Sequence, residues 1–200
     1  MTLPKHVPDV AALVLAAGQS RRMGTTNKLL AKVGQSTMVA GVVDTLCRCS
    51  MIQDIIVVTG YQRTAIETAL RGKPVRFVHN PHYSLGLSTS LRAGVPGLRN
   101  NDGALVCLAD MPKVNTEHID KLVAAFGATD QSRICVPVYA GRRGNPVLWP
   151  RRFFAELAAT SGDVGARHLI RKHGSWVLDV PMNDDGVLFD IDTPDALGAV

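Results

Sequence analysis

The sequence lacks the signatures of several broad classes of protein. Its four cysteines form neither a disulfide framework nor a zinc-binding spacing. Aromatic residues make up 5% of the chain and no long basic run occurs, so the net charge of +5 favours small phosphorylated ligands over nucleic acid. No apolar run approaches the ~18 residues of a membrane span, and the opening MTLPKHVPDV lacks the core of a signal peptide. We therefore expect a cytoplasmic protein that binds neither nucleic acid nor membranes.

Apolar runs of strand length alternate with segments of helical period along the whole chain. The expected strands are Val10–Ala16, Ile52–Thr59, Val75–His79, Ala104–Ala109, Arg133–Tyr139, Trp176–Val180 and Val187–Ile191. The expected helices are Ser36–Cys49, Gln62–Leu70, Leu87–Val95, Thr116–Phe126, Arg152–Ala158, Val164–His173 and Pro194–Val200. Continuous apolar strands are typical of a parallel sheet that is buried on both faces. The sequence thus predicts one α/β domain, residues 1–200: a three-layer α/β/α sandwich around a Rossmann-like, mostly parallel sheet.

The first expected strand runs directly into a cationic loop, AAGQSRRMGTTNK. Its two glycines are six positions apart with none between them, which excludes both the dinucleotide fingerprint and the P-loop. The small side chains of Ala16, Ala17 and Gly18 leave main-chain atoms open to a base and ribose, while Arg22 and Lys28 lie further along, where a triphosphate would extend. The alternative is a tight turn with solvated cations.

Two acidic motifs follow expected strands. Asp110 comes at the carboxyl end of an apolar strand, where a carboxylate is costly to bury unless a cation pairs with it, and Mg²⁺ suits such a site. Asp190 and Asp192 are two apart, so on an extended strand they share one face. Helix capping is the alternative for Asp110, and for Asp192 the alternative is that it helps Thr193 to cap the last helix. No H-E-x-x-H spacing occurs, so a histidine metal site is not expected.

A polar segment separates a third expected strand from the next helix. Asn80 ends the strand, and Gly86, Ser88 and Ser90 open the helix. Backbone N–H groups and hydroxyls at a helix N-terminus suit an anion or the edge of a nucleobase. Capping of the helix by Ser88 is the alternative, and the sequence does not decide between the two.

The order of these motifs resembles the MobA-like nucleoside triphosphate transferases. The pattern L-A-A-G-x-S-x-R-M-G-x-x-x-K runs from Leu15 to Lys28, and its Ala16-Ala17 pair is similar to the molybdenum cofactor cytidylyltransferases, whereas guanylyl-transferring relatives typically have L-A-G-G. Residues 142–147 follow a strand and are expected to form a turn, and residues 162–167 open a helix; the two segments look like the G-x-P and G-D-x-G-A-R elements that face the pterin substrate in the cytidylyltransferases. The resemblance covers nearly the whole chain.

The resemblance implies a role for each matching residue. The nucleotide-binding residues would be Leu15, Ala16, Ala17, Gly18, Ser20, Arg22, Lys28, Asn80, Gly86, Ser88 and Ser90. The catalytic residues would be Lys28, Arg22 and Asp110, with Asp110, Asp190 and Asp192 at the metal. The residues on the acceptor side would be Arg142, Arg143, Asn145, Asp163 and Arg167.

The implied activity is transfer of CMP from CTP to the phosphate of the molybdopterin form of the molybdenum cofactor, with Mg²⁺ as cofactor and pyrophosphate as the leaving group. The product would serve enzymes of the xanthine dehydrogenase class, one of which is a possible partner. Two alternatives stay open. One is a guanylyltransferase, or a cytidylyltransferase with another phosphorylated acceptor. The other is a non-catalytic module that binds nucleotide or delivers the cofactor.

Overall fold

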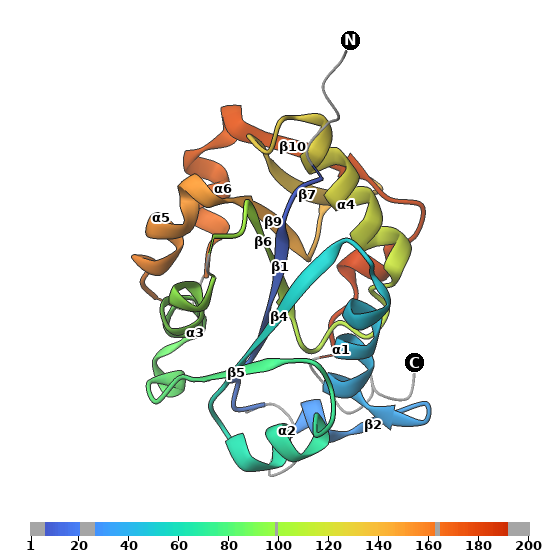
Figure 1. The fold of residues 1–200 in the computed structure, drawn as a ribbon, viewed down its shortest axis with the longest axis vertical. Helices are drawn as coiled ribbons and strands as arrows, with labels where there is room; N and C mark the ends of the chain where they lie inside the picture. Colours follow the sequence, from blue (N-terminus) through green and yellow to red (C-terminus); the bar gives the residue numbers. More distant parts are fainter. Residues whose placement is uncertain (1–6, 21–26, 99, 163–164, 192–200) are drawn as a thin grey trace.

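A computed structural model describes residues 7–20, 27–98, 100–162 and 165–191 (Figure 1). The central sheet has the strand order β10-β7-β9-β6-β1-β4-β5, with β8 paired to β7. Its strands are β1 (Val10–Ala16), β4 (Ile52–Thr59), β5 (Arg76–His79), β6 (Gly103–Leu108), β7 (Ile134–Tyr139), β8 (Arg142–Arg143), β9 (Val147–Pro150) and β10 (Val177–Pro181). A separate hairpin consists of β2 (Lys32–Val33) and β3 (Ser36–Thr37).

Helices cover both faces of the sheet. The α-helices are α1 (Met38–Arg48), α2 (Arg63–Ala69), α3 (Leu87–Gly94), α4 (Thr116–Ala128), α5 (Phe154–Ala158) and α6 (Arg167–Lys172). Short 3₁₀ helices are η2 (Lys28–Leu30), η3 (Tyr83–Leu85), η4 (Val95–Gly97), η5 (Arg151–Phe153), η6 (Gly174–Trp176) and η7 (Asp185–Leu188). Among the described residues, no helix combines the length and the apolarity that crossing a bilayer requires. All four cysteines are free thiols.

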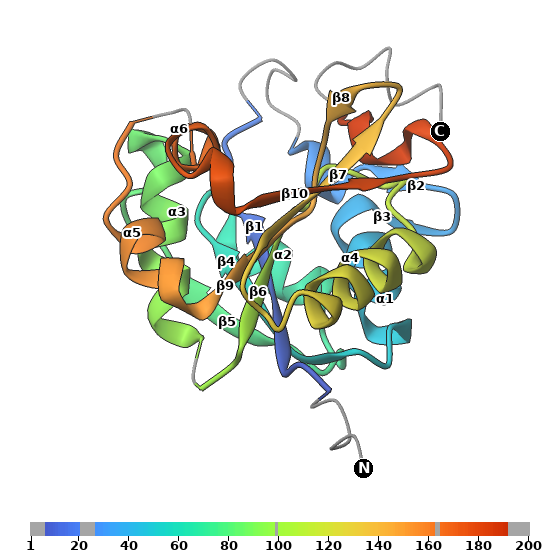
Figure 2. The ribbon, with the colours of Figure 1, turned by 90° about the horizontal axis from the view of Figure 1, so that it is seen from above.

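The two faces of β1 belong to different hydrophobic cores, which confirms the predicted three-layer sandwich. Val10, Ala12 and Val14 pack with residues of α1, α2 and α4. Leu13 and Leu15, on the opposite face, pack with residues of α3, α5 and α6. Because successive side chains of a strand point to opposite faces, a strand that is apolar at every position buries both. Figure 2 shows these two groups of helices on either side of the sheet.

Most of the sheet is parallel, as the apolar runs predict. β1 pairs in parallel with both β4 and β6, with Val14 opposite Val57 and Cys107. β8 and β9 are the exceptions: β8 runs antiparallel to β7, and β9 runs antiparallel to both β6 and β7. The connection from β7 to β9, residues 140–146, is too short for a crossover helix, so the chain must return in the opposite direction.

The sequence predictions were wrong at two places. The expected strand Val187–Ile191 is not a strand: η7 includes Val187, and the Asp184 side chain caps η7 by accepting from the Gly186 N–H at 2.8 Å. Arg142–Val147, expected as a turn, contains β8 and the first residue of β9. The expected helix Pro194–Val200 lies outside the described residues.

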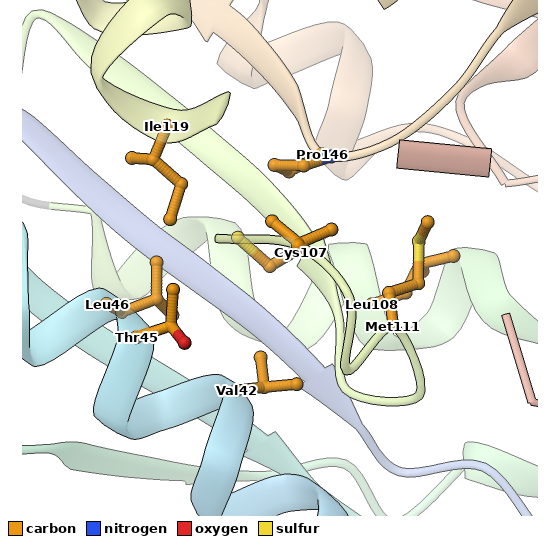
Figure 3. Close-up of a pocket in the computed structure, with 9 residues that line it drawn as sticks. Val42, Thr45, Leu46, Cys107, Leu108, Met111, Ile119 and Pro146 are labelled. Carbon is orange, nitrogen blue, oxygen red and sulfur yellow. The ribbon is translucent and has the colours of Figure 1, made fainter. Parts of the chain in front are cut away.

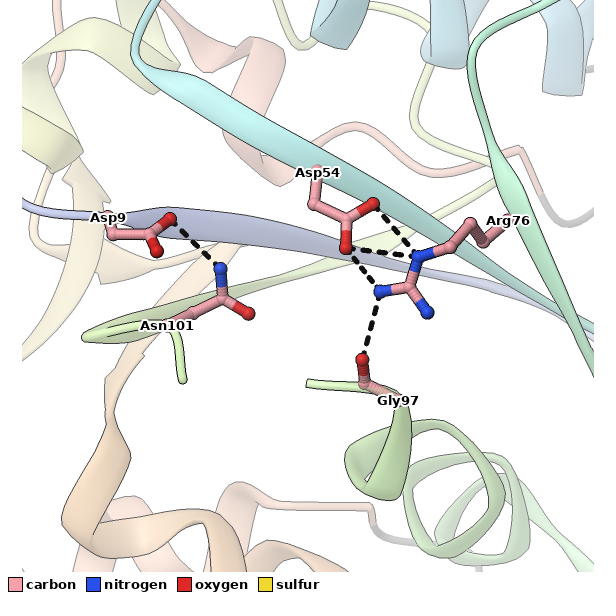
Figure 4. A network of polar contacts seen from close by, with 5 residues as sticks. All are labelled: Asp9, Asp54, Arg76, Gly97 and Asn101. Carbon is pink, nitrogen blue, oxygen red and sulfur yellow. Dashed lines mark hydrogen bonds and ion pairs between the residues drawn. The ribbon is translucent and has the colours of Figure 1, made fainter. Parts of the chain in front are cut away.

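A polar network closes the amino-terminal edge of the sheet (Figure 4). The Arg76 guanidinium forms a bidentate ion pair with Asp54 and also donates to the Gly97 carbonyl at 2.9 Å. The Asn101 side chain donates to the Asp9 carboxylate at 2.9 Å. These residues lie near the amino ends of β1, β4, β5 and β6, so this edge is occupied by structural contacts, and the carboxyl edge is left for the loops considered next.

Candidate active site

The loop after β1 and the loop after β4 meet at the carboxyl edge of the sheet. The Tyr61 N–H donates to the Ala17 carbonyl at 3.2 Å. A Cβ added to Gly60 would lie 2.8 Å from the Ala17 Cβ, so both loops need small residues to approach this closely. Ala17 is buried in this contact and therefore has a packing role that the sequence did not reveal.

Gly18 has no such role in packing. A Cβ added there would meet no described atom within 4 Å, and its φ lies outside the left-handed region that favours glycine. Gly18 is also exposed. Neither packing nor backbone conformation among the described residues therefore requires a glycine here, whereas close approach of a ligand to the main chain would.

Ser20 and Asn27 fix the end of the same loop. Ser20 adopts a positive φ of 52°, and its hydroxyl accepts from the Lys28 N–H at 3.2 Å. The buried Asn27 side chain accepts from the Leu29 N–H at 3.1 Å and so caps η2. Asn27 was not among the predicted site residues, although an asparagine just before a short helix is a common capping signal. These contacts place Lys28 at the start of η2. Arg22 lies outside the described residues.

Lys28 and Asp110 form an ion pair at the centre of the site. Lys28 Nζ lies 2.6 Å from Asp110 Oδ2, and the two side chains are only 14% and 19% exposed. Burial raises the pKa of Asp110, although the neighbouring Lys28 ammonium acts in the opposite direction. The other carboxylate oxygen, Oδ1, is buried and has no hydrogen-bond partner among the described residues. Such an oxygen suits a hard divalent cation, so the residues present fit Mg²⁺.

The acidic motif near the end of the chain lies beside Asp110. The Ile191 N–H donates to the Asp110 carbonyl at 3.1 Å, and the charge of Asp190 also raises the pKa of Asp110. Asp190 is exposed, and Asp192 lies outside the described residues. Within the described part of the chain no three Asp, Glu, His or Cys side chains form a metal-binding cluster. One or two carboxylates are enough for Mg²⁺ when phosphate oxygens and water supply the other ligands.

The predicted polar segment before α3 is held together by Asn80. The Asn80 side chain is 1% exposed; its amide donates to Thr89 Oγ1 at 2.8 Å and to Ser90 Oγ at 3.1 Å, and its oxygen accepts from the His82 N–H at 2.9 Å. Asn80 therefore organises this segment from within. Ser88 and Ser90 are buried, and Gly86, with a φ of 105°, makes the turn into α3.

Residues predicted on the acceptor side occupy two different regions of the carboxyl edge, one at β8 and one at α6 (Figure 2). Arg142 and Arg143 are exposed on β8, where Arg143 forms a bidentate pair with Asp179 at 2.7 and 3.1 Å. Arg167 is exposed at the start of α6. Asp163 lies outside the described residues.

A close contact on one side and a backbone hydrogen bond on the other hold these two regions in place. A Cβ added to Gly165 would lie 2.8 Å from the Leu87 side chain, so the turn before α6 packs against the start of α3. On the other side, the Asn145 N–H donates to the Val187 carbonyl at 2.9 Å, which ties the β8–β9 connection to η7. Both regions therefore border the site, and they do so from opposite sides.

An apolar pocket lies beside Asp110, between α1, α4 and β6 (Figure 3). It is lined by Val42, Thr45, Leu46, Cys107, Leu108, Met111, Val114, Ile119 and Pro146. No charged side chain lines it, so it does not suit a triphosphate, which carries several negative charges.

Comparison with known proteins identifies the family. A family model of the MobA-like NTP transferase domain matches residues 12–176. The chain is 27% identical to the nicotine blue oxidoreductase of Paenarthrobacter nicotinovorans, over 94% of each chain. It is 25% identical to the molybdenum cofactor cytidylyltransferase of Escherichia coli K12, over 93% of this chain and 92% of that one. A homologue of Mycobacterium tuberculosis Rv0371c from Mycobacterium sp. strain JC1 has a similar structure, with a TM-score of 0.83, 28% identity, and coverage of 95% of this chain and 93% of that one.

Proposed function

This chain belongs to the family of MobA-like NTP transferase domains, and we propose that it transfers CMP from CTP to the phosphate of a molybdopterin-type cofactor. The single observation that carries the proposal is the Lys28–Asp110 pair, which places a cation and a carboxylate with a buried, unpartnered oxygen at the same edge of the sheet as Gly18. A triphosphate needs this combination of charges, and the exposed glycine gives the rest of the nucleotide access to the main chain.

The residues of the site would promote the reaction in two ways: they position the two substrates, and they neutralise negative charge on the phosphates. A phosphate oxygen of the acceptor attacks the α-phosphorus of CTP, the bond between that phosphorus and the bridging oxygen breaks, and pyrophosphate leaves. Asp110, with Asp190 or Asp192, would hold Mg²⁺, whose charge offsets the charge on the phosphate oxygens when it is bound. Lys28 and Arg22 contribute further positive charge. A cation ~4 Å from a phosphate oxygen, at an effective dielectric of ~20, interacts by ~4 kcal/mol before the cost of desolvation is subtracted.

The choice of CTP and of a pterin acceptor is supported by two observations. The Ala16-Ala17 pair and the segment 162–167 match the pattern of cytidylyltransferases, and a relative of nearly the same length is a molybdenum cofactor cytidylyltransferase. Arg142 and Arg167, exposed on the two sides of the site, are the residues we assign to the phosphate and the pterin of the acceptor. A molybdoenzyme of the xanthine dehydrogenase class would receive the product.

The test is an analysis of products. The purified chain is incubated with Mg²⁺, molybdenum-loaded pterin and each of the four nucleoside triphosphates in turn, pyrophosphate release is followed, and the product is identified by mass. We expect the cytosine dinucleotide with CTP alone. A guanine dinucleotide would replace the proposal with a guanylyltransferase, and binding of CTP and pterin without pyrophosphate release would indicate a delivery module. A parallel assay with nicotine blue tests for redox turnover of the kind that one relative's name describes.

A further inference from the structure

The segment 183–191, which carries Asp190, docks along the loop and helix that follow Asp110. At one end of the segment, the Asn183 side chain donates to Glu117 at 2.9 Å. At the other end, the Ile191 N–H donates to the Asp110 carbonyl at 3.1 Å. Two elements that are far apart in sequence therefore lie together over a length that includes both of the described acidic residues proposed for the metal.

Between these ends the packing is too close to allow sliding. A Cβ added to Gly186 would lie 2.5 Å from the Lys113 carbonyl oxygen and 3.0 Å from His118 Cε1. The Lys113 ammonium lies over the Phe189 ring, 3.8 Å from its centre. Any displacement of η7 along α4 would break this contact or create an overlap at Gly186, so the register of the segment is fixed.

His118 is the buried polar residue at the centre of this contact. Its side chain is 2% exposed, and its Nδ1 accepts from the Asn115 N–H at 3.3 Å. Because a backbone N–H can only donate, Nδ1 carries no proton, and in the neutral ring the proton is on Nε2. Nε2 lies 3.1 Å from Asp184 Oδ1, a distance typical of a hydrogen bond, although the ring N–H does not point directly at the oxygen. Capping of α4 uses only Nδ1, so the contact of Nε2 needs a different explanation.

Asp184 connects this histidine to the metal-binding segment. The same oxygen, Oδ1, accepts from the Gly186 N–H at 2.8 Å, which starts η7. The Gly186 N–H and, to a smaller extent, His118 lower the pKa of Asp184, so the carboxylate is charged at neutral pH. One carboxylate oxygen thus links the N-terminus of α4 to the start of η7.

We propose that His118 and Asp184 are positioning residues that hold Asp190 at a fixed distance from Asp110 and so set the geometry of the divalent cation site. The inference rests on the proposed function, because it concerns the cation proposed there. Neither residue is among those proposed to bind the nucleotide. Side chains that contact and orient metal ligands without touching the metal contribute to its binding, and their loss weakens metal affinity by roughly 10- to 100-fold.

The test measures Mn²⁺ binding to the full chain by electron paramagnetic resonance, without nucleotide and at a temperature well below unfolding. We expect His118→Ala and Asp184→Ala each to raise the dissociation constant for Mn²⁺ by roughly 10-fold. Asp184→Asn keeps an oxygen for the Gly186 N–H and for His118, so it should stay within about twofold of the parent chain.

The matched control is Asp185→Ala, because Asp185 is the next residue of the same segment and its side chain makes no hydrogen bond or ion pair with the described residues. If Asp184→Ala binds Mn²⁺ as tightly as this control, the positioning role is wrong while the metal site stands. If the parent chain binds no Mn²⁺, the metal site of the proposed function fails, and the inference fails with it. Asp184 is 53% exposed, so its variants decide the question if His118→Ala does not fold.

Discussion

At the scale of single residues, the proposed function gives Lys28 one partner in the free protein and another when ligands are bound. Without ligands, the ammonium is 2.6 Å from the carboxylate and balances its buried charge. In the proposed complex, a bound divalent cation would balance the charge of Asp110, and the Lys28 ammonium would contact the phosphates. Under this proposal, Lys28 would compete with the metal in the free protein and assist catalysis in the complex.

Replacing Lys28 should separate these two effects. In Lys28→Met we expect turnover to fall about 100-fold or more, since ~2.7 kcal/mol of lost barrier stabilisation already corresponds to that factor. Binding of Mn²⁺ without nucleotide, measured at pH 8, should become tighter because the competing ammonium is gone. The control is Lys32→Met, which removes an exposed lysine of β2. Weaker Mn²⁺ binding in Lys28→Met, or normal turnover, would contradict this change of partner.

The pH dependence of metal binding follows from the raised pKa of Asp110. Burial raises this pKa, so as the pH falls the carboxylate takes up a proton earlier than an exposed aspartate does, and Mn²⁺ affinity should fall with it. Lys28 lowers the same pKa, so in Lys28→Met the loss of affinity should move to higher pH. The folding equilibrium has the opposite dependence on pH: the folded state holds this proton more tightly, so the stability that this group contributes is lost as the pH rises through the folded pKa. Titrations of Mn²⁺ between pH 8 and pH 5 in both chains check the shift, and identical profiles would refute it.

At the scale of elements, the segments around η7 depend on close contacts between backbones. A Cβ added to Gly144 would lie 2.1 Å from the Val187 carbonyl oxygen, so Gly144→Ala must push the β8–β9 connection away from η7. We expect a loss of about 2 kcal/mol in the free energy of unfolding, measured by urea denaturation. Gly174→Ala serves as the control, because a Cβ there meets no described atom within 4 Å. Equal stability of the two variants would mean that the contact is not tight.

The same region shows where prediction from sequence ends. β1 and β4 begin and end where their apolar runs predict, because burial on both faces leaves a signal at every position. Val187–Ile191 is also mostly apolar, yet it is not a strand: Val187 and Leu188 belong to η7, which Asp184 caps, and Gly186 packs against Lys113, a residue far away in sequence.

For the site, the rule that ligands bind at the carboxyl ends of parallel strands predicts that Lys28 and Asp110 lie close together. It could not reveal that Asn80 is occupied by internal hydrogen bonds, or that Ala17 packs on Gly60. Those contacts depend on the path of loops whose sequences carry no periodic pattern. The contact of His118 Nε2 with Asp184 was hidden for the same reason.

At the scale of the whole molecule, the two edges of the sheet have separate tasks. The network around Arg76 lies at the amino edge (Figure 4), and the candidate site lies at the carboxyl edge. A change at the amino edge should therefore alter stability without altering the chemistry.

Arg76→Ala tests this separation. The substitution removes the bidentate pair with Asp54 and the bond to the Gly97 carbonyl, and we expect it to lower the free energy of unfolding by about 1 to 2 kcal/mol. Mn²⁺ affinity and turnover at 25 °C should stay at the parental values. Arg63→Ala, which removes an exposed pair with Glu67 within one helix, is the control and should cost about 0.5 kcal/mol or less. A large loss of turnover in Arg76→Ala would show that the edges are coupled.

The most direct test of the proposed nucleotide and metal site is a crystal structure of the chain with CTP and Mn²⁺, in which the metal is located by its anomalous scattering. We expect a manganese peak bonded to the Asp110 carboxylate, the cytidine against the main chain at Gly18, and the Lys28 ammonium on the phosphates instead of on Asp110. A nucleotide bound at another place, or a manganese peak away from Asp110 with the Lys28–Asp110 pair intact, would contradict the proposed site.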